Sequence, residues 1–142
     1  MKIGTLVAAI LGGLVMFGMG GLVFGFLLSE YFKANTIEYA GLVKDPPLVW
    51  LIYLFNVIWA WVIAYVLEYG GRSGVAEGAK MGAILLFAIS LGITVEFEAF
   101  MNVHRSFSPI LVQLAVIIVM GAIGGAVIGW IQAFFDRRAS QV

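Results

Sequence analysis

The sequence predicts an all-α protein, a four-helix transmembrane bundle with short loops. Three observations lead to this prediction: 63% of the residues are hydrophobic, only 11% are charged, and the apolar residues gather in four long runs. A soluble domain of 142 residues needs more charge than this to cover its surface. The runs do not alternate polar and apolar residues, as the strands of a membrane β-barrel would. We therefore expect helices, with lipid as their solvent.

Each run approaches the roughly 20 residues that a helix needs to cross the hydrocarbon core. The expected spans cover residues 3–29, 48–68, 77–101 and 109–133 of one integral membrane domain. The first run follows Lys2 and contains no polar cleavage region, so we interpret it as a retained helix rather than a signal peptide. Pro109 suits the first turn of the last helix, where its missing N–H group costs no hydrogen bond.

Four spans place both termini on one side of the membrane. Five basic residues lie on that side and three on the other, namely Lys2, Arg72, Lys80, Arg137 and Arg138 against Lys33, Lys44 and Arg105. Because basic residues are enriched on the cytoplasmic side, this bias favours cytoplasmic termini.

Charge and composition exclude several classes of function. Eight basic and eight acidic residues cancel, which gives no electrostatic case for a nucleic-acid partner. The chain has no cysteine, so disulfides, thiolate metal sites and cysteine nucleophiles are excluded. We expect no cofactor, no metal ion and no catalytic residues, because the single histidine and the scattered carboxylates match no known arrangement. Membrane lipid is the expected surrounding partner.

Polar residues at membrane depth are functional candidates, because burying them in lipid is costly. On the third span they recur at steps of four, four, four and three, at Ser90, Thr94, Glu98, Asn102 and Arg105. If the helix continues through them, these side chains form one polar stripe. The stripe is either a path for a transported substrate or a set of interfacial charges that pair, such as Glu98 with Arg105.

Five further residues complete the candidate polar or transport site. Glu30, Glu96 and His104 lie at the same end of the bundle as Glu98, although Glu96 points about 200° away from Glu98 on the helix. Asn56 in the second span and Gln113 in the fourth either hydrogen-bond across helices or line a pore.

Glycines recur every four residues or nearly so on the first and fourth spans. The predicted helix-packing residues are Gly18, Gly21, Gly25, Gly121, Gly125 and Gly129. Such spacing lets a neighbouring backbone approach closely. We expect the first and fourth spans to meet along these stripes, either within one chain or across a homo-oligomer.

Three segments together resemble a known family. They are Glu77-Gly78-Ala79-Lys80-Met81-Gly82, residues 102–109, and Met120-Gly121-Ala122-Ile123-Gly124-Gly125. Over residues 75–131 the chain is similar to an uncharacterised family of small four-helix bacterial inner-membrane proteins, a DUF1761-like domain of unknown function. The resemblance implies a bacterial inner membrane and four helices, and it implies no particular activity.

Three functional hypotheses follow from these patterns. The first is an oligomeric transporter or channel subunit that uses the polar stripe, since four helices rarely enclose a pathway alone. The second is a structural or accessory subunit that binds a partner membrane subunit through its glycine faces. The third is a membrane protein, enzymatic or not, that binds lipid or quinone.

Overall fold

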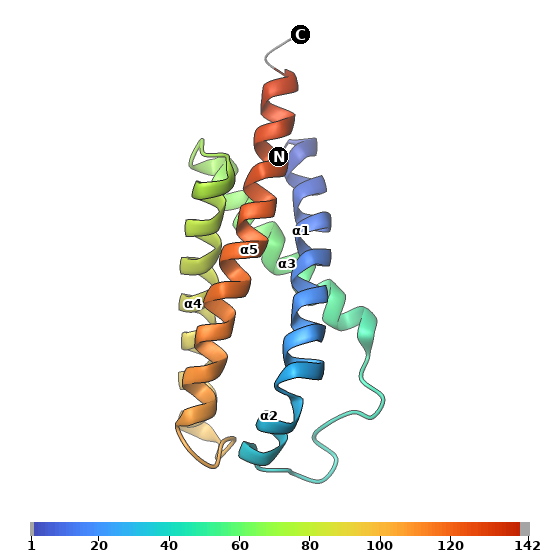
Figure 1. Cartoon of the computed structure of the whole chain (residues 1–142), viewed down its shortest axis with the longest axis vertical. Coiled ribbons are helices and arrows are strands. Elements are labelled where there is room, and N and C mark those ends of the chain that lie inside the picture. The colour runs from blue at the N-terminus through green and yellow to red at the C-terminus, as the bar shows by residue number, and fades with distance from the viewer. Residues whose placement is uncertain (1, 140–142) are drawn as a thin grey trace.

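The structure is a computed structural model that describes residues 2–139. Its helices are α1 (Ile3–Leu22), the π-helical turn η1 (Val23–Leu27), α2 (Ser29–Asn35), α3 (Val49–Tyr69), α4 (Val75–Phe100) and α5 (Ser108–Ala139). Figure 1 shows them as an elongated bundle without strands in the described residues. Four stretches are long and apolar enough to cross a membrane, with α1 and η1 counted as one. The predicted all-α bundle with four spans is therefore confirmed.

The two chain ends lie at the same end of the bundle (Figure 1). We call this the terminal end, and we call the opposite end, which holds α2 and the 101–107 loop, the loop end. The observed spans begin and end close to the predicted ones except at the C-terminus. There α5 continues to Ala139, six residues beyond the predicted end at residue 133, and the Arg138 guanidinium lies 4.4 Å from the centre of the Phe134 ring.

Helices α4 and α5 pack backbone against backbone. A methyl group added to Gly125 would overlap the backbone of Gly78, and one added to Gly121 would overlap that of Gly82. At the terminal end of the same contact, the Gly74 N–H donates to the Gly129 carbonyl oxygen at 2.9 Å. The glycines of α5 thus pack as predicted against a neighbouring backbone, but within the chain the partner is α4 and not α1.

The predicted stripe of α1 has no such partner in the chain. A methyl group added to Gly18, Gly21 or Gly25 would meet no atom within 4 Å. Helix α1 instead packs through glycines nearer its beginning, where Gly12 faces Ile128 of α5 and Gly13 faces Val57 of α3. Within one chain, Gly18, Gly21 and Gly25 therefore do not meet the α5 stripe, and their meeting across a homo-oligomer stays a prediction.

The packed core occupies the terminal half of the bundle. The buried residues of α1 all lie between Gly4 and Met16, and those of α3 lie between Asn56 and Leu67. The fully buried Ile63, Leu67 and Ile128 join α3 to α5 there. Toward the loop end α3 diverges: it crosses behind α1 and begins on the side away from α4 (Figure 1).

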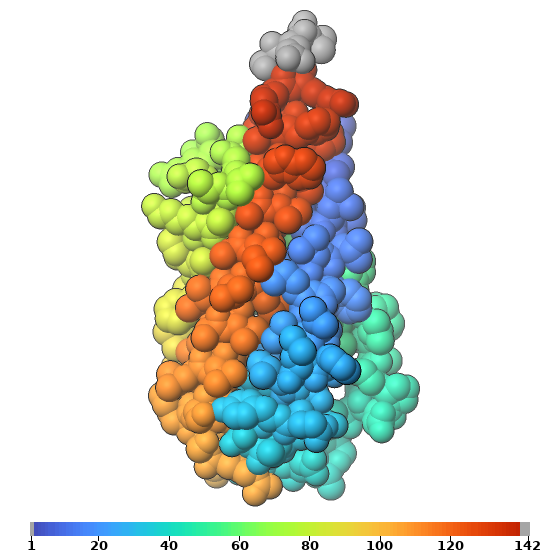
Figure 2. Space-filling model, in the orientation of Figure 1, coloured from blue at the N-terminus to red at the C-terminus, as the bar shows by residue number. Residues whose placement is uncertain are grey.

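The loop end is closed by backbone hydrogen bonds between distant segments. Residues next to the α2 C-terminus pair with the 101–107 loop, where Ile37 N–H donates to Val103 O at 2.9 Å and Arg105 N–H donates to Asn35 O at 2.8 Å. The Tyr39 hydroxyl adds a bond to the Asn102 carbonyl at 2.7 Å. On the face that Figure 2 presents, side chains of α1, α2 and α5 meet without a hollow between them.

Candidate functional site

The loop half of the bundle contains a cavity of about 590 Å³. It exists because α3 packs mainly on α1 and α4 mainly on α5, so that the two pairs separate where α3 diverges. Its walls come from all four spans and are almost wholly apolar, with Phe24, Phe55, Trp59 and Ile93 among them. Apolar walls favour apolar guests over water.

Two polar side chains line this apolar cavity. Asn56 of α3 is 8% exposed, and its Nδ2 donates to the carbonyl oxygen of Ile52 at 2.8 Å. A carbonyl can only accept a hydrogen bond, so this contact fixes the orientation of the amide and turns Oδ1 away from Ile52. Ser90 of α4 also lines the cavity. Within residues 2–139, neither Asn56 Oδ1 nor the Ser90 hydroxyl has a hydrogen-bond partner.

Glycines form part of the cavity wall. Gly20, Gly21 and Gly25 line it, and the space next to Gly21 and Gly25 is empty to at least 4 Å. The missing side chains therefore leave room on the α1 and η1 side. Gly18 also faces empty space, but it does not line the cavity.

The predicted polar stripe of the third span is interrupted. Helix α4 ends at Phe100, and Met101 is extended with φ −137° and ψ 143°. Asn102 and Arg105 therefore leave the helix and join the loop that pairs with residues 35–37. Ser90 lines the cavity and Thr94 is buried, so only the inner part of the stripe faces the protein interior.

The carboxylate of Glu98 pairs with His104 rather than with Arg105. The Glu98 Oε1 and His104 Nδ1 atoms are 2.5 Å apart, and the His104 side chain is 11% exposed. The Arg105 guanidinium instead donates to the Thr36 carbonyl at 3.5 Å. The predicted Glu98–Arg105 pair was wrong, because the end of α4 lets the chain turn and bring His104 back toward Glu98.

The other predicted candidates do not join the cavity. Glu30 forms an exposed ion pair with Lys33 at 3.1 Å. Glu96 is exposed, and Gln113 is half-buried on α5 outside the cavity lining. Of the ten predicted polar candidates, the structure thus brings only Asn56 and Ser90 to the cavity.

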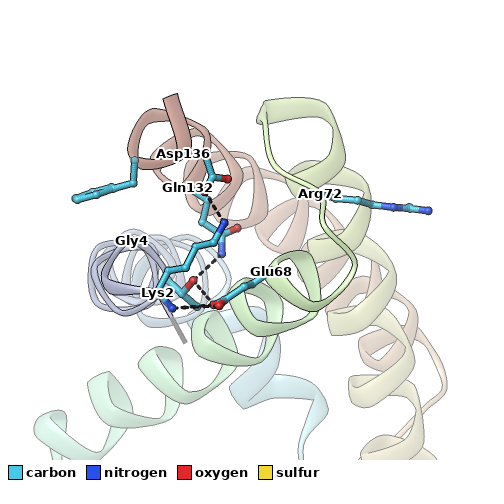
Figure 3. Close-up of a pocket in the computed structure, with 8 residues that line it drawn as sticks. Lys2, Gly4, Glu68, Arg72, Gln132 and Asp136 are labelled. Carbon is cyan, nitrogen blue, oxygen red and sulfur yellow. Dashed lines mark hydrogen bonds and ion pairs between the residues drawn. The ribbon is translucent and has the colours of Figure 1, made fainter. Parts of the chain in front are cut away.

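A second polar cluster lies at the terminal end and joins α1, α3 and α5 (Figure 3). The Thr5 hydroxyl donates to Glu68 Oε2 at 2.5 Å, and the Gln132 amide nitrogen donates to Ala64 O at 2.7 Å and to Thr5 Oγ1 at 3.4 Å. Gln132 Oε1 is buried without a partner among residues 2–139, beside a space of about 20 Å³, which suits one water molecule.

An ion pair completes this terminal cluster. Lys2 Nζ lies 2.7 Å from Asp136 Oδ1, and this hydrogen bond together with the aspartate charge raises the pKa of Lys2 above its ordinary value. Sequence reasoning missed the cluster. The signal was available, since Thr5 and Gln132 interrupt apolar runs near the same predicted side of the membrane. We interpret the cluster as structural: its hydrogen bonds and its ion pair hold the terminal ends of α1, α3 and α5 together.

Comparison with known proteins adds no relative: no family model, no curated protein and no solved structure matches the chain. The resemblance noted from the sequence therefore stays a prediction.

Proposed function

We propose that this membrane protein binds a lipid-like molecule in the cavity of its loop half. The observation that carries the proposal is the cavity itself, which is apolar, bounded by all four spans and about 590 Å³ in volume. A cavity of about 150 Å³ holds one benzene, so this one has room for roughly four such groups, or a chain of some 24 carbon atoms. That is the size of an acyl or isoprenoid chain, and ligand sites in proteins span the same range of volumes.

The packing of the helices suggests a route of entry from the bilayer. Side chains of α1, α2 and α5 close one face (Figure 2), whereas α3 and α4 each pack mainly on another helix. We infer that the cavity opens between α3 and α4. A guest in the surrounding lipid would then enter sideways, without leaving the hydrocarbon region.

The same packing gives less support to conduction through a single chain. The terminal half is filled by Ile63, Leu67 and Ile128, which are fully buried, and the polar stripe ends with α4 at Phe100. A polar path would have to cross this packed half. Transport through an oligomer stays a prediction from the sequence, as does an accessory role.

Fluorescence quenching tests the proposal directly, because Trp59 lines the cavity. The test protein retains only this tryptophan, through Trp50→Phe, Trp61→Phe and Trp130→Phe. It is placed in nanodiscs of a phospholipid brominated midway along one acyl chain. We expect strong quenching of Trp59, since bromine acts only near contact with the indole ring.

Two matched variants show whether the quenching comes from the cavity. Gly21→Leu with Gly25→Leu fills space that is empty in the chain and should protect Trp59. Gly18→Leu adds the same side chain where there is also room, but outside the cavity, and should leave quenching unchanged. An unquenched Trp59 in the parent protein would refute lipid entry, and it would favour a second protein chain as the occupant. Equal quenching in all three proteins would place the lipid contact elsewhere.

A further inference from the structure

The chemistry inside the cavity narrows the class of ligand, and this inference rests on the proposed function. Asn56 is more than nine-tenths buried and lines an apolar space, one of its two amide hydrogens is used by Ile52 O, and its Oδ1 has no hydrogen-bond partner among the described residues. A polar atom that faces an apolar space without a hydrogen bond is destabilised. A guest that supplies a donor to this oxygen is therefore favoured over one that does not.

The depth of these groups excludes an ordinary phospholipid as the best guest. Asn56 lies seven residues from the start of α3 and Ser90 ten residues from the end of α4, so they lie about 10 and 15 Å from the loop ends of their helices. The hydrocarbon core is about 30 Å thick, and lipid headgroups lie outside it. An acyl chain of a phospholipid would therefore present only methylene groups to Asn56 and Ser90.

We propose that the cavity selects an elongated apolar molecule that carries a hydroxyl group at mid-membrane depth. A hydroxyl both donates and accepts hydrogen bonds, so it can donate to Asn56 Oδ1, the oxygen that the described residues leave without a partner. A ketone, an ester or an oxidised quinone only accepts, so it can bond the second amide hydrogen of Asn56 but leaves Asn56 Oδ1 unpaired. The ligand class is therefore a long-chain or polycyclic alcohol, in which the rest of the molecule fills the apolar part of the cavity.

Competition in the Trp59 assay tests this selectivity. The probe is the brominated phospholipid, and the competitors are 1-octadecanol, 1-methoxyoctadecane and octadecane, each added at known mole fractions of the bilayer. The three share a chain and differ in donor capacity, since only the alcohol can donate. We expect 1-octadecanol to restore Trp59 emission at a mole fraction about tenfold lower than either analogue, the effect of one buried polar group left unpaired.

A substitution then assigns the selectivity to its residue. Asn56→Leu, which is close in size and keeps the wall apolar, should remove the tenfold advantage of the alcohol over the ether. Ser90→Ala should leave that advantage, because the alcohol and the ether accept equally and Asn56 Oδ1 still receives the donor.

The outcomes separate this inference from the proposed function. Equal displacement by all three competitors in the parent protein would overturn the hydroxyl proposal, with water satisfying Asn56, while lipid binding would stand. Selectivity that survives Asn56→Leu would also overturn it. Absence of any quenching by the brominated lipid would refute the proposed function itself.

Discussion

The glycine contact between α4 and α5 allows a test in which only packing changes. Gly125→Ala adds a methyl group that would overlap the Gly78 carbonyl, whereas Gly21→Ala adds the same group next to empty space. Both substitutions raise helix propensity by about 0.5–1 kcal/mol relative to glycine. That gain cancels when the two variants are compared, which leaves the cost of forcing two backbones apart.

The expected cost follows from the nature of the contact. The overlapping atoms belong to backbone, which cannot rotate away as a side-chain end can, so α4 and α5 must separate along their length. Overpacking of this kind costs about 1–3 kcal/mol. We therefore expect Gly125→Ala to be less stable than Gly21→Ala by about that amount.

Reversible unfolding in mixed detergent micelles, followed by circular dichroism, measures the difference. Gly78→Ala on the opposite helix provides a second disruptive variant, because its methyl group would overlap the Gly125 carbonyl. If Gly125→Ala and Gly21→Ala unfold within about 0.5 kcal/mol of each other, the close approach of α4 and α5 is not what holds these helices together.

Three other predictions concern the core, the terminal cluster and the topology. Ile63→Ala should destabilise the bundle by about 2–5 kcal/mol in the same unfolding assay, because Ile63 is fully buried, and a cost below about 1 kcal/mol would argue against a packed terminal half. Thr5→Val should lower the thermal midpoint of unfolding, since it removes the hydroxyl that donates to Glu68 and accepts from Gln132. Thr5→Ser keeps the hydroxyl and should retain most of the stability. An equal loss of stability in both variants would show that packing, and not the hydroxyl, is responsible. Cysteines placed singly at Arg138 and Lys44 should label from the cytoplasmic and the outer side respectively, and labelling of Arg138→Cys from outside intact cells would reverse the proposed orientation.

The fold could be predicted from the sequence because each span is a continuous apolar run of sufficient length. The end of α4 could not be predicted, since neither proline nor glycine stands near Phe100. What ends the helix is tertiary: the 101–107 loop pairs with residues 35–37, which are more than 60 positions away. The predicted polar stripe assumed that the helix continues to Asn102 and Arg105, and it is not formed because α4 ends at Phe100.

The candidate site was predictable only as a set of polar residues. Asn56 and Ser90 are visible in the sequence as polar groups within apolar runs, but the cavity that both of them line depends on the divergence of α3 from α4 and α5. Glycine spacing was ambiguous for a related reason. A glycine has no side chain, so a neighbouring helix can either pack against it or leave the space empty. The same spacing is found where α4 packs against Gly121 and Gly125 and where the space beside Gly21 and Gly25 is empty.

The π-helical turn at Val23–Leu27 makes the length of this segment matter more than its composition. Its N–H to O bond, from Leu28 to Val23 at 2.8 Å, spans five residues, one more than an α-helical bond spans. The wider turn therefore holds one residue more than regular helix would hold over the same arc. Deleting one residue here would convert the turn to regular helix and leave the elements on either side close to their present orientation. It would, however, change which side chains of the segment lie at the positions of Phe24 and Gly25 on the cavity wall. Substitutions elsewhere in the segment leave those two positions unchanged.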